Sequence, residues 1–282
     1  MGRVTTRVPV VKFRYAASAP PASRPDTVVV EEPLEIRVDG EVLTVTMRTP
    51  GADIDLIHGY LVAEGVIRSG SDIVGARYCA GSVSDGPDGT AQITYNVLEV
   101  DLARADRTRL LAAGRIVPTT SACGVCGSAS IEALTAKLPQ SLAGLPVTLA
   151  AADVPAYVAK LGAGQGVFRS TGGAHAAAVF EAGGDLRAHA EDIGRHNAVD
   201  KAIGAVVRAG REPPLGGVLA VSSRASYEIV QKAAMAGIPV VIAVSAPSSL
   251  AVAAAESLGM TLIAFARDDG LNVYAGAGRL GD

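Results

Sequence analysis

The sequence predicts an α/β protein, in which an α+β part comes first and a three-layer domain with a mixed sheet follows. One observation is a predicted strand pair, residues 174–181 and 186–193, joined by a glycine-rich turn. Another is the alternation of helical and strand patterns after this pair. The apolar runs 240–244 and 262–265 are continuous, as in central strands that are covered on both faces.

The first half of the chain has the short apolar segments and turns of antiparallel strands. Asp39 and Gly40 predict a hairpin turn. Asp53 can cap a helix that ends near Gly65, and a shorter helix is expected over residues 130–138. The predicted strands of this half are residues 28–30, 34–38, 42–47, 73–78 and 93–100.

In the second half, helical spacing of apolar residues alternates with apolar runs of strand length. Gly237 and Gly259 each mark the end of a helix. The predicted helices are residues 153–161, 194–208, 227–236 and 249–258, and the further strands are residues 218–222, 239–245 and 261–266. The last of these strands completes the predicted sheet.

Proline and glycine mark the expected domain boundaries. Residues 1–26 hold three prolines and are expected to form a flexible, poorly ordered leader. Residues 27–150 are expected to form a β-rich N-terminal domain that ends in a cysteine-bearing arm and a short helix. A stretch rich in proline and glycine, residues 139–152, precedes the expected C-terminal α/β ligand-binding domain, residues 151–282.

Composition excludes several classes of protein. The net charge of -3 over 282 residues gives no basic excess for nucleic acid. No apolar run reaches the roughly 18 residues that a membrane span requires, and no apolar stretch follows the first basic residues, so no secretory signal is predicted. Three cysteines in a long chain favour a reduced, cytoplasmic protein over a disulfide framework.

Cys123 and Cys126 form a C-x-x-C spacing inside a segment of glycines, hydroxyl residues and small apolar side chains. Because Gly124 and Gly127 loosen the backbone and nothing bulky anchors it, we expect an exposed, mobile arm. Four interpretations stay open: a zinc site, for which only Cys79 and scattered histidines remain as ligands; a thioredoxin-like redox centre; two small residues in a loop; and a thiolate that accepts sulfur as a persulfide.

His189, Ala190 and Glu191 match the H-x-E of zinc nucleobase deaminases, which is followed later by P-C-x-x-C. Here the two cysteines precede the histidine, and no proline precedes Cys123. The order therefore argues against deamination, and His189 is expected to be a half-buried strand residue. No resident metal site is predicted.

Polar residues recur where predicted strands run into helices. Each such loop is expected at the carboxyl end of its strand, where open α/β sheets bind ligands. A helix N-terminus with cationic side chains is a natural seat for phosphate. The sequence therefore predicts an extended, phosphate-bearing ligand. The candidate binding residues are Gly172, Gly173, His175, Asp192, Arg195, His196, Ser223, Arg224 and Ser245.

Several segments are long and uncommon, and together they resemble the FdhD family, the formate dehydrogenase accessory sulfurtransferases. The resemblance covers the chain from about residue 28 to its end. The matching segments are residues 48–51, 58–65, 121–127, 168–177, 191–201, 223–228 and 244–250.

This resemblance implies a cytoplasmic homodimer with a cytidine-deaminase-like C-terminal fold. It implies a sulfurtransferase that takes sulfur from a cysteine desulfurase and passes it to the molybdenum of the bis-molybdopterin guanine dinucleotide cofactor, which formate dehydrogenase needs. GDP-like nucleotides would mimic that cofactor. The family's persulfide cysteine falls on Cys123, and Cys126 is the assisting or resolving thiol.

The family's cofactor-binding stretch falls on the last predicted strand, on Phe265, Ala266, Arg267, Asp268, Asp269 and Gly270. The family pattern has glycines and a second basic residue after the arginine, whereas two aspartates follow here and Leu271 takes the basic place. Carboxylates repel phosphate but accept hydrogen bonds from the N–H groups of guanine, so we expect this end to hold the guanine. A thiol-disulfide oxidoreductase and a non-catalytic chaperone that binds the molybdenum cofactor stay open as alternative functions.

Overall fold

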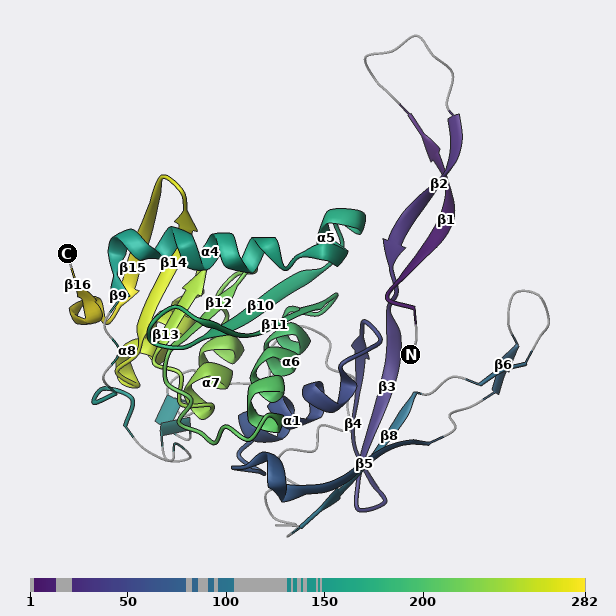
Figure 1. Cartoon of the computed structure of the whole chain (residues 1–282), viewed down its shortest axis with the longest axis horizontal. Coiled ribbons are helices and arrows are strands. Elements are labelled where there is room, and N and C mark those ends of the chain that lie inside the picture. The colour runs from purple at the N-terminus through teal and green to yellow at the C-terminus, as the bar shows by residue number, and fades with distance from the viewer. Residues whose placement is uncertain are drawn as a thin grey trace.

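A six-stranded mixed sheet forms the centre of the second half of the chain in this computed structural model (Figure 1). Strands β12, β13 and β14 are parallel, whereas β11, β10 and β15 join the sheet in antiparallel pairings. The order is β11-β10-β12-β13-β14-β15. The strands are β10 (His175–Phe180), β11 (Leu186–Asp192), β12 (Val218–Val221), β13 (Val240–Ala243), β14 (Thr261–Arg267) and β15 (Gly270–Ala275). The predicted α/β class is confirmed.

The structure describes part of the chain, and everything below concerns those residues. They are residues 3–13, 22–79, 83–85, 91–93, 96–103, 131–132, 134–135, 138, 141–145, 147 and 149–281.

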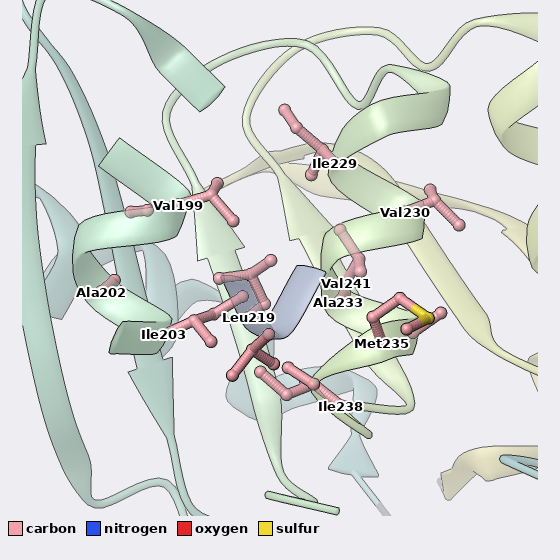
Figure 2. Packing of buried hydrophobic residues seen from close by; sticks show 14 of the residues in the cluster. Val199, Ala202, Ile203, Leu219, Ile229, Val230, Ala233, Met235, Ile238 and Val241 are labelled. Carbon is pink, nitrogen blue, oxygen red and sulfur yellow. The ribbon is translucent and has the colours of Figure 1, made fainter. Parts of the chain in front are cut away.

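Helices cover both faces of the six-stranded sheet, which gives the three predicted layers. α4 (Val154–Ala163) packs on one face, and α6 (Arg195–Arg208), α7 (Tyr227–Met235) and α8 (Ser249–Ser257) pack on the other. Side chains alternate accordingly along β12, because Val218 faces α4 whereas Leu219 faces α6 and α7. Figure 2 shows Leu219 among side chains of α6 and α7. The finer likeness to cytidine deaminases stays a prediction.

The N-terminal half adds a four-stranded sheet with the order β4-β3-β8-β5. Asp39 and Gly40 connect β3 to β4, and both have positive φ angles, 49° and 85°, so the predicted hairpin turn is confirmed. The strands are β3 (Glu32–Val38), β4 (Glu41–Arg48), β5 (Ile73–Cys79) and β8 (Val97–Leu102), and a separate pair comprises β6 (Val83–Asp85) and β7 (Ala91–Ile93).

Helix α1 (Asp53–Ala63) joins the two halves by packing against α6. The backbones nearly touch, since a Cβ atom on Gly59 would lie 2.0 Å from the carbonyl oxygen of Asp200. One continuous core runs from the N-terminal sheet into α6, α7 and α8. The division into domains 27–150 and 151–282 stays a prediction.

Two details near the start of the chain differ from the sequence prediction. Asp53 does not cap α1, because the N-cap is Ala52 and the Asp53 carboxylate pairs with Arg48 instead. The expected poorly ordered leader contains two strands, β1 (Thr5–Lys12) and β2 (Ala22–Val29), which pair over eight positions as an arm extending from the body (Figure 1).

The remaining described elements are short. Ile131, Glu132, Leu134 and Thr135 are helical, which confirms those positions of the predicted helix 130–138. None of the helices that the structure describes is long and apolar enough to cross a membrane. The short elements are α5 (Gly166–Thr171), β9 (Leu149–Ala150), β16 (Leu280–Gly281), and the 3-10 turns Gly70–Asp72, Ala151–Asp153 and Ala277–Arg279.

Candidate functional site: one edge of the sheet and the cavity beside it

The predicted ligand residues of the second half meet at one edge of the six-stranded sheet. Parallel β12, β13 and β14 end there, and their loops carry Ser223, Arg224 and Ser245. Antiparallel β10 begins at the same edge and β11 ends there, because His175 pairs with Asp192. The convergence that the sequence predicted is therefore confirmed by the topology. Gly172 and Gly173 precede β10, and residues 265–270 span the end of β14, the turn after it and the first residue of β15.

Hydrogen bonds tie these loops into one continuous rim. Ser222 accepts a hydrogen bond from the Ala176 amide at its side-chain oxygen, 2.9 Å away. The Ala225 amide donates to the Ala246 carbonyl over 3.1 Å, and the Phe265 amide donates to the Ser245 carbonyl over 3.3 Å. The loops after β12 and β13 and the end of β14 therefore hold one another in place at the edge.

Asp192 lies beneath this rim and is completely buried. Its carboxylate accepts hydrogen bonds from Lys201 Nζ at 2.7 Å, the Gly194 amide at 2.7 Å and the Thr49 amide at 3.1 Å. Burial raises the pKa of Asp192, whereas Lys201 and the amide donors oppose that rise. In this arrangement Asp192 positions the loop that leads to Arg195, and its oxygens are already occupied by donors of the chain.

Cationic side chains gather around His175 at the rim. Burial lowers the pKa of His175, and the charges of Arg195, His196 and Arg224 lower it further, so the imidazole is neutral at neutral pH. The Nε atom of Arg195 is buried and has no hydrogen-bond partner among the described residues. His196 Nε2 lies 2.9 Å from Glu228 Oε2, which holds the ring in place. Such a cluster at the start of a 14-residue helix is suited to an anion.

A cavity of about 610 Å³ adjoins the rim on the side of the N-terminal sheet. Three predicted residues, His175, Arg195 and His196, line this cavity as well as belonging to the rim. None of the other predicted binding residues, Asp192 included, lines the cavity. Most of the polar residues that line the cavity are not among the predicted binding residues. They are Glu31, Thr44, Thr46, Glu64, Asn197, Asp200, Glu228, Gln231 and Lys232.

The missed residues come from elements of both halves. Thr44 and Thr46 share one face of β4, and Asn197 of α6 donates to the Met47 carbonyl over 2.8 Å. At the base of the cavity, Lys232 Nζ lies 2.8 Å from both carboxylate oxygens of Asp200. The spacing of threonines along β4 was the available signal, but nothing local shows that this strand faces α6.

The predicted guanine-binding stretch forms the tip between β14 and β15. Phe265 has a positive φ of 50° and is 37% exposed, and it lies in the bulge between Ala264 and Arg267 in the pairing with β15. Ala266 points inward and is fully buried. Arg267, Asp268, Asp269 and Gly270 are exposed at the turn. Direct contact with a ligand through Ala266 would have to use its backbone.

The deaminase-like triplet of β11 has structural roles. His189 is half-buried, as expected, and its Nε2 atom lies 3.1 Å from the Leu161 carbonyl oxygen of α4. Glu191 accepts hydrogen bonds of 2.8 Å from the amides of Val167 and Phe168, at the start of α5. These contacts account for both side chains without a metal.

Cys123 and Cys126 lie outside the residues that the structure describes. Cys79, at the end of β5, is a free, partly buried cysteine. Within the described part of the chain, no group of three or more His, Cys, Asp or Glu side chains is arranged to hold a metal ion.

Comparison with known proteins identifies the family of the chain. The model of the FdhD/NarQ family matches residues 29–281, which is nearly the whole chain. The chain belongs to the FdhD/NarQ family. The resemblance seen in the sequence motifs is thereby confirmed.

FdhD/NarQ relatives match over almost their full length. The chain is 52% identical to the sulfur carrier protein FdhD of Nocardia farcinica, over 99% of this chain and 96% of the relative. It is 48% identical to the protein of the same name from Mycobacterium tuberculosis, over 95% and 97%. A crystal structure described as a candidate formate dehydrogenase accessory protein from Desulfotalea psychrophila has a TM-score of 0.73 at 22% identity, over 99% and 100% of the two chains. That structure confirms the fold.

Proposed function

We propose that this chain is a sulfur carrier that serves formate dehydrogenase. The observation that carries the proposal is its identity of about half to relatives named sulfur carrier protein FdhD, over nearly the full length of both chains. The chain accepts sulfur from a cysteine desulfurase and transfers it to the molybdenum of the bis-molybdopterin guanine dinucleotide cofactor. In this proposal the protein is a cytoplasmic homodimer, and the cofactor is its cargo.

Cys123 receives the sulfur. Its thiolate attacks the outer sulfur of the desulfurase persulfide, the donor's S–S bond breaks, and the desulfurase cysteine leaves as a thiolate. Cys126 then attacks the inner sulfur of the Cys123 persulfide, so that a disulfide forms and the outer sulfur departs as sulfide toward the metal. Two electrons pass from the cysteines to the transferred atom, and a cellular dithiol reduces the disulfide afterwards.

The cofactor's nucleotide binds at the rim of the six-stranded sheet. The guanidinium groups of Arg195 and Arg224 beside the start of α6, with the His196 ring next to them, support a phosphate there. The exposed carboxylates of Asp268 and Asp269 support a guanine at the β14–β15 turn, because carboxylates accept from its N–H groups.

The sulfur-transfer step is tested with Cys123→Ser. The variant should not support formate dehydrogenase activity in a strain that lacks the native gene, because a hydroxyl cannot carry a persulfide. Mass spectrometry after incubation with a cysteine desulfurase and cysteine should show a gain of one sulfur on the wild type and none on the variant. Cys79→Ser is the matched control, and it should behave as the wild type.

Other outcomes of this experiment identify the alternatives. A Cys123→Ser variant that still supports the enzyme would contradict sulfur transfer and indicate a cofactor-binding chaperone. Catalytic turnover of a disulfide substrate, with no gain of sulfur after treatment with the desulfurase, would indicate a thiol-disulfide oxidoreductase.

The guanine site is tested with the double variant Asp268→Ala, Asp269→Ala. We expect its GDP affinity to fall by roughly tenfold or more, because two acceptors for the base are lost. The control is Asp185→Ala with Glu212→Ala, which removes two exposed carboxylates elsewhere on the chain. Isothermal titration calorimetry gives the dissociation constants, and equal affinity of the wild type and the Asp268, Asp269 variant would refute the assignment.

A further inference from the structure

The arm formed by β1 and β2 has little of the body to pack against. It is antiparallel over eight residue pairs and is therefore about 26 Å long. Its contact with the body is at its root, where Val29 lies next to Gly173; a Cβ atom on that glycine would be 3.0 Å from Val29 Cγ1. An isolated two-stranded hairpin is marginally stable in water, so such an arm needs a partner surface.

Apolar side chains on the arm are left uncovered. Phe13 is 66% exposed, Val11 is 59% exposed and Val28 is 36% exposed. Val11 and Val28 lie on opposite faces of the ribbon, because Val11 pairs with Ser23 whereas Val28 pairs with Thr6. A partner can therefore bury apolar surface on either face.

The arm carries charge opposite to that of the rest of the chain. Its two strands contain three basic residues, Arg7, Lys12 and Arg24, and one acidic residue, Asp26, whereas the rest of the sequence has 22 lysines and arginines against 27 aspartates and glutamates. The remainder of the chain therefore has an excess of acid. This division is self-complementary, since the basic arm of one copy fits the acidic body of another.

Two prolines decide how the arm can bind. Pro9 and Pro25 face each other in the ladder, and neither has an N–H group, so both edges of the ribbon lack a donor at this position. Addition of a further strand along either edge is disfavoured. The arm is thus suited to contact through its side-chain faces.

We propose that the β1–β2 arm clasps a second copy of this chain. In a two-fold dimer both arms take part, since the same patch is used on each subunit. A ribbon about 26 Å by 10 Å covers roughly 260 Å², so two arms and the surfaces beneath them bury on the order of 1,000 Å², the size of a specific interface. The dimer is part of the proposed function, and the arm as its clasp is the addition.

The test is the double variant Val11→Asp, Phe13→Asp in the full-length chain. Because both side chains are exposed in the single chain, the substitutions leave its fold intact. Sedimentation velocity over a dilution series should show a dimer for the wild type and a dissociation constant raised by roughly 100-fold or more in the variant. Raising sodium chloride from about 0.05 to 0.5 M should weaken the wild-type dimer, because the attraction between arm and body is screened.

The matched control is Val74→Asp, at an equally exposed valine of β5, which should leave the dissociation constant unchanged. A thermal melt at low protein concentration shows that the arm variant is folded. A wild type that is monomeric throughout would remove both the dimer and the clasp. An arm variant that dimerises with wild-type affinity would refute the role of the arm but not the dimer. An arm variant that stays dimeric but no longer binds formate dehydrogenase would likewise refute the arm as the dimer contact.

Discussion

Arg48 and Asp53 form an ion pair in which both side chains are almost completely buried. The guanidinium reaches the carboxylate with two nitrogens, at 3.0 and 3.1 Å. The Tyr78 hydroxyl donates to the same carboxylate over 3.2 Å, and burial together with this carboxylate raises the pKa of Tyr78 to about 12. The phenol therefore stays a protonated donor, and the end of β4 is fixed to the start of α1 and to β5.

Substitution of Asp53 by Asn should destabilise the protein strongly. The change leaves the buried Arg48 guanidinium with only the partly exposed Glu32 carboxylate, 3.3 Å away, so we expect a loss of up to about 3–5 kcal/mol of unfolding free energy. The control is Asp101→Asn, which breaks the exposed pair of Asp101 with Arg77 and should leave the stability nearly unchanged. Urea denaturation measures both values, and similar losses for the two variants would refute the distinction between buried and exposed pairs.

For single residues, the sequence indicates which side chains are important but not which partners they contact. Asp53 is the ordinary capping residue before a helix, yet its carboxylate pairs with Arg48, five residues earlier. Asp192 likewise looks like part of a ligand loop, although it is buried against Lys201. Neither partner can be chosen from local spacing, because several cations lie at suitable distances along the chain.

The crossing of α1 and α6 is the closest helix contact that the structure describes between the two halves. A Cβ atom on Gly204 would lie 1.8 Å from the carbonyl oxygen of Asp55, and one on Gly59 would meet the Asp200 carbonyl. Both obstacles are backbone atoms that cannot rotate away. The two glycines therefore set the distance between the helices, and with it the width of the cavity lined by Leu56 and Asp200.

Replacement of Gly204 by Ala should push the two helices apart. We expect a loss of roughly 2–3 kcal/mol in unfolding free energy from overpacking, despite the better helix propensity of alanine. The control is Gly162→Ala in α4, where a Cβ atom meets only the end of Gln165 at 4.0 Å. That variant should be neutral or more stable by up to about 1 kcal/mol. Thermal and urea unfolding compare the stabilities of the two variants. Equal stability would contradict the claim that the α1–α6 contact leaves no room for a Cβ atom at residue 204.

Elements with a strong local pattern were predicted well, and weakly patterned elements were missed. Local sequence patterns alone predict the turn at Asp39 and Gly40 and the apolar strands β12, β13 and β14. β1 and most of β2 were missed because their prolines are unfavourable in strands, and only the end of β2 was predicted, within residues 28–30. β15 and α5 were missed because they are short and mostly exposed, which leaves little apolar periodicity.

Across the whole molecule, the rim could be predicted but the cavity could not. The rim follows from the rule that parallel strands end at a common edge, and the loops after β12, β13 and β14 obey it. The cavity depends on how β4 and α1 pack against α6, a contact between residues about 150 apart. Its lining residues are scattered over both halves, so no window of sequence contains them together.

The glycine crossing bears on how the chain is made. A ribosome releases α1 long before the residues of α6 have been joined to the chain, so Leu56, Ile57 and Leu61 have no partner helix during that interval. Contacts between residues that are far apart in the sequence form slowly during folding. A nascent chain halted before Gly204 would therefore expose the apolar face of α1 to solvent. The first hundred residues would complete their packing only after the last third of the chain has been synthesised.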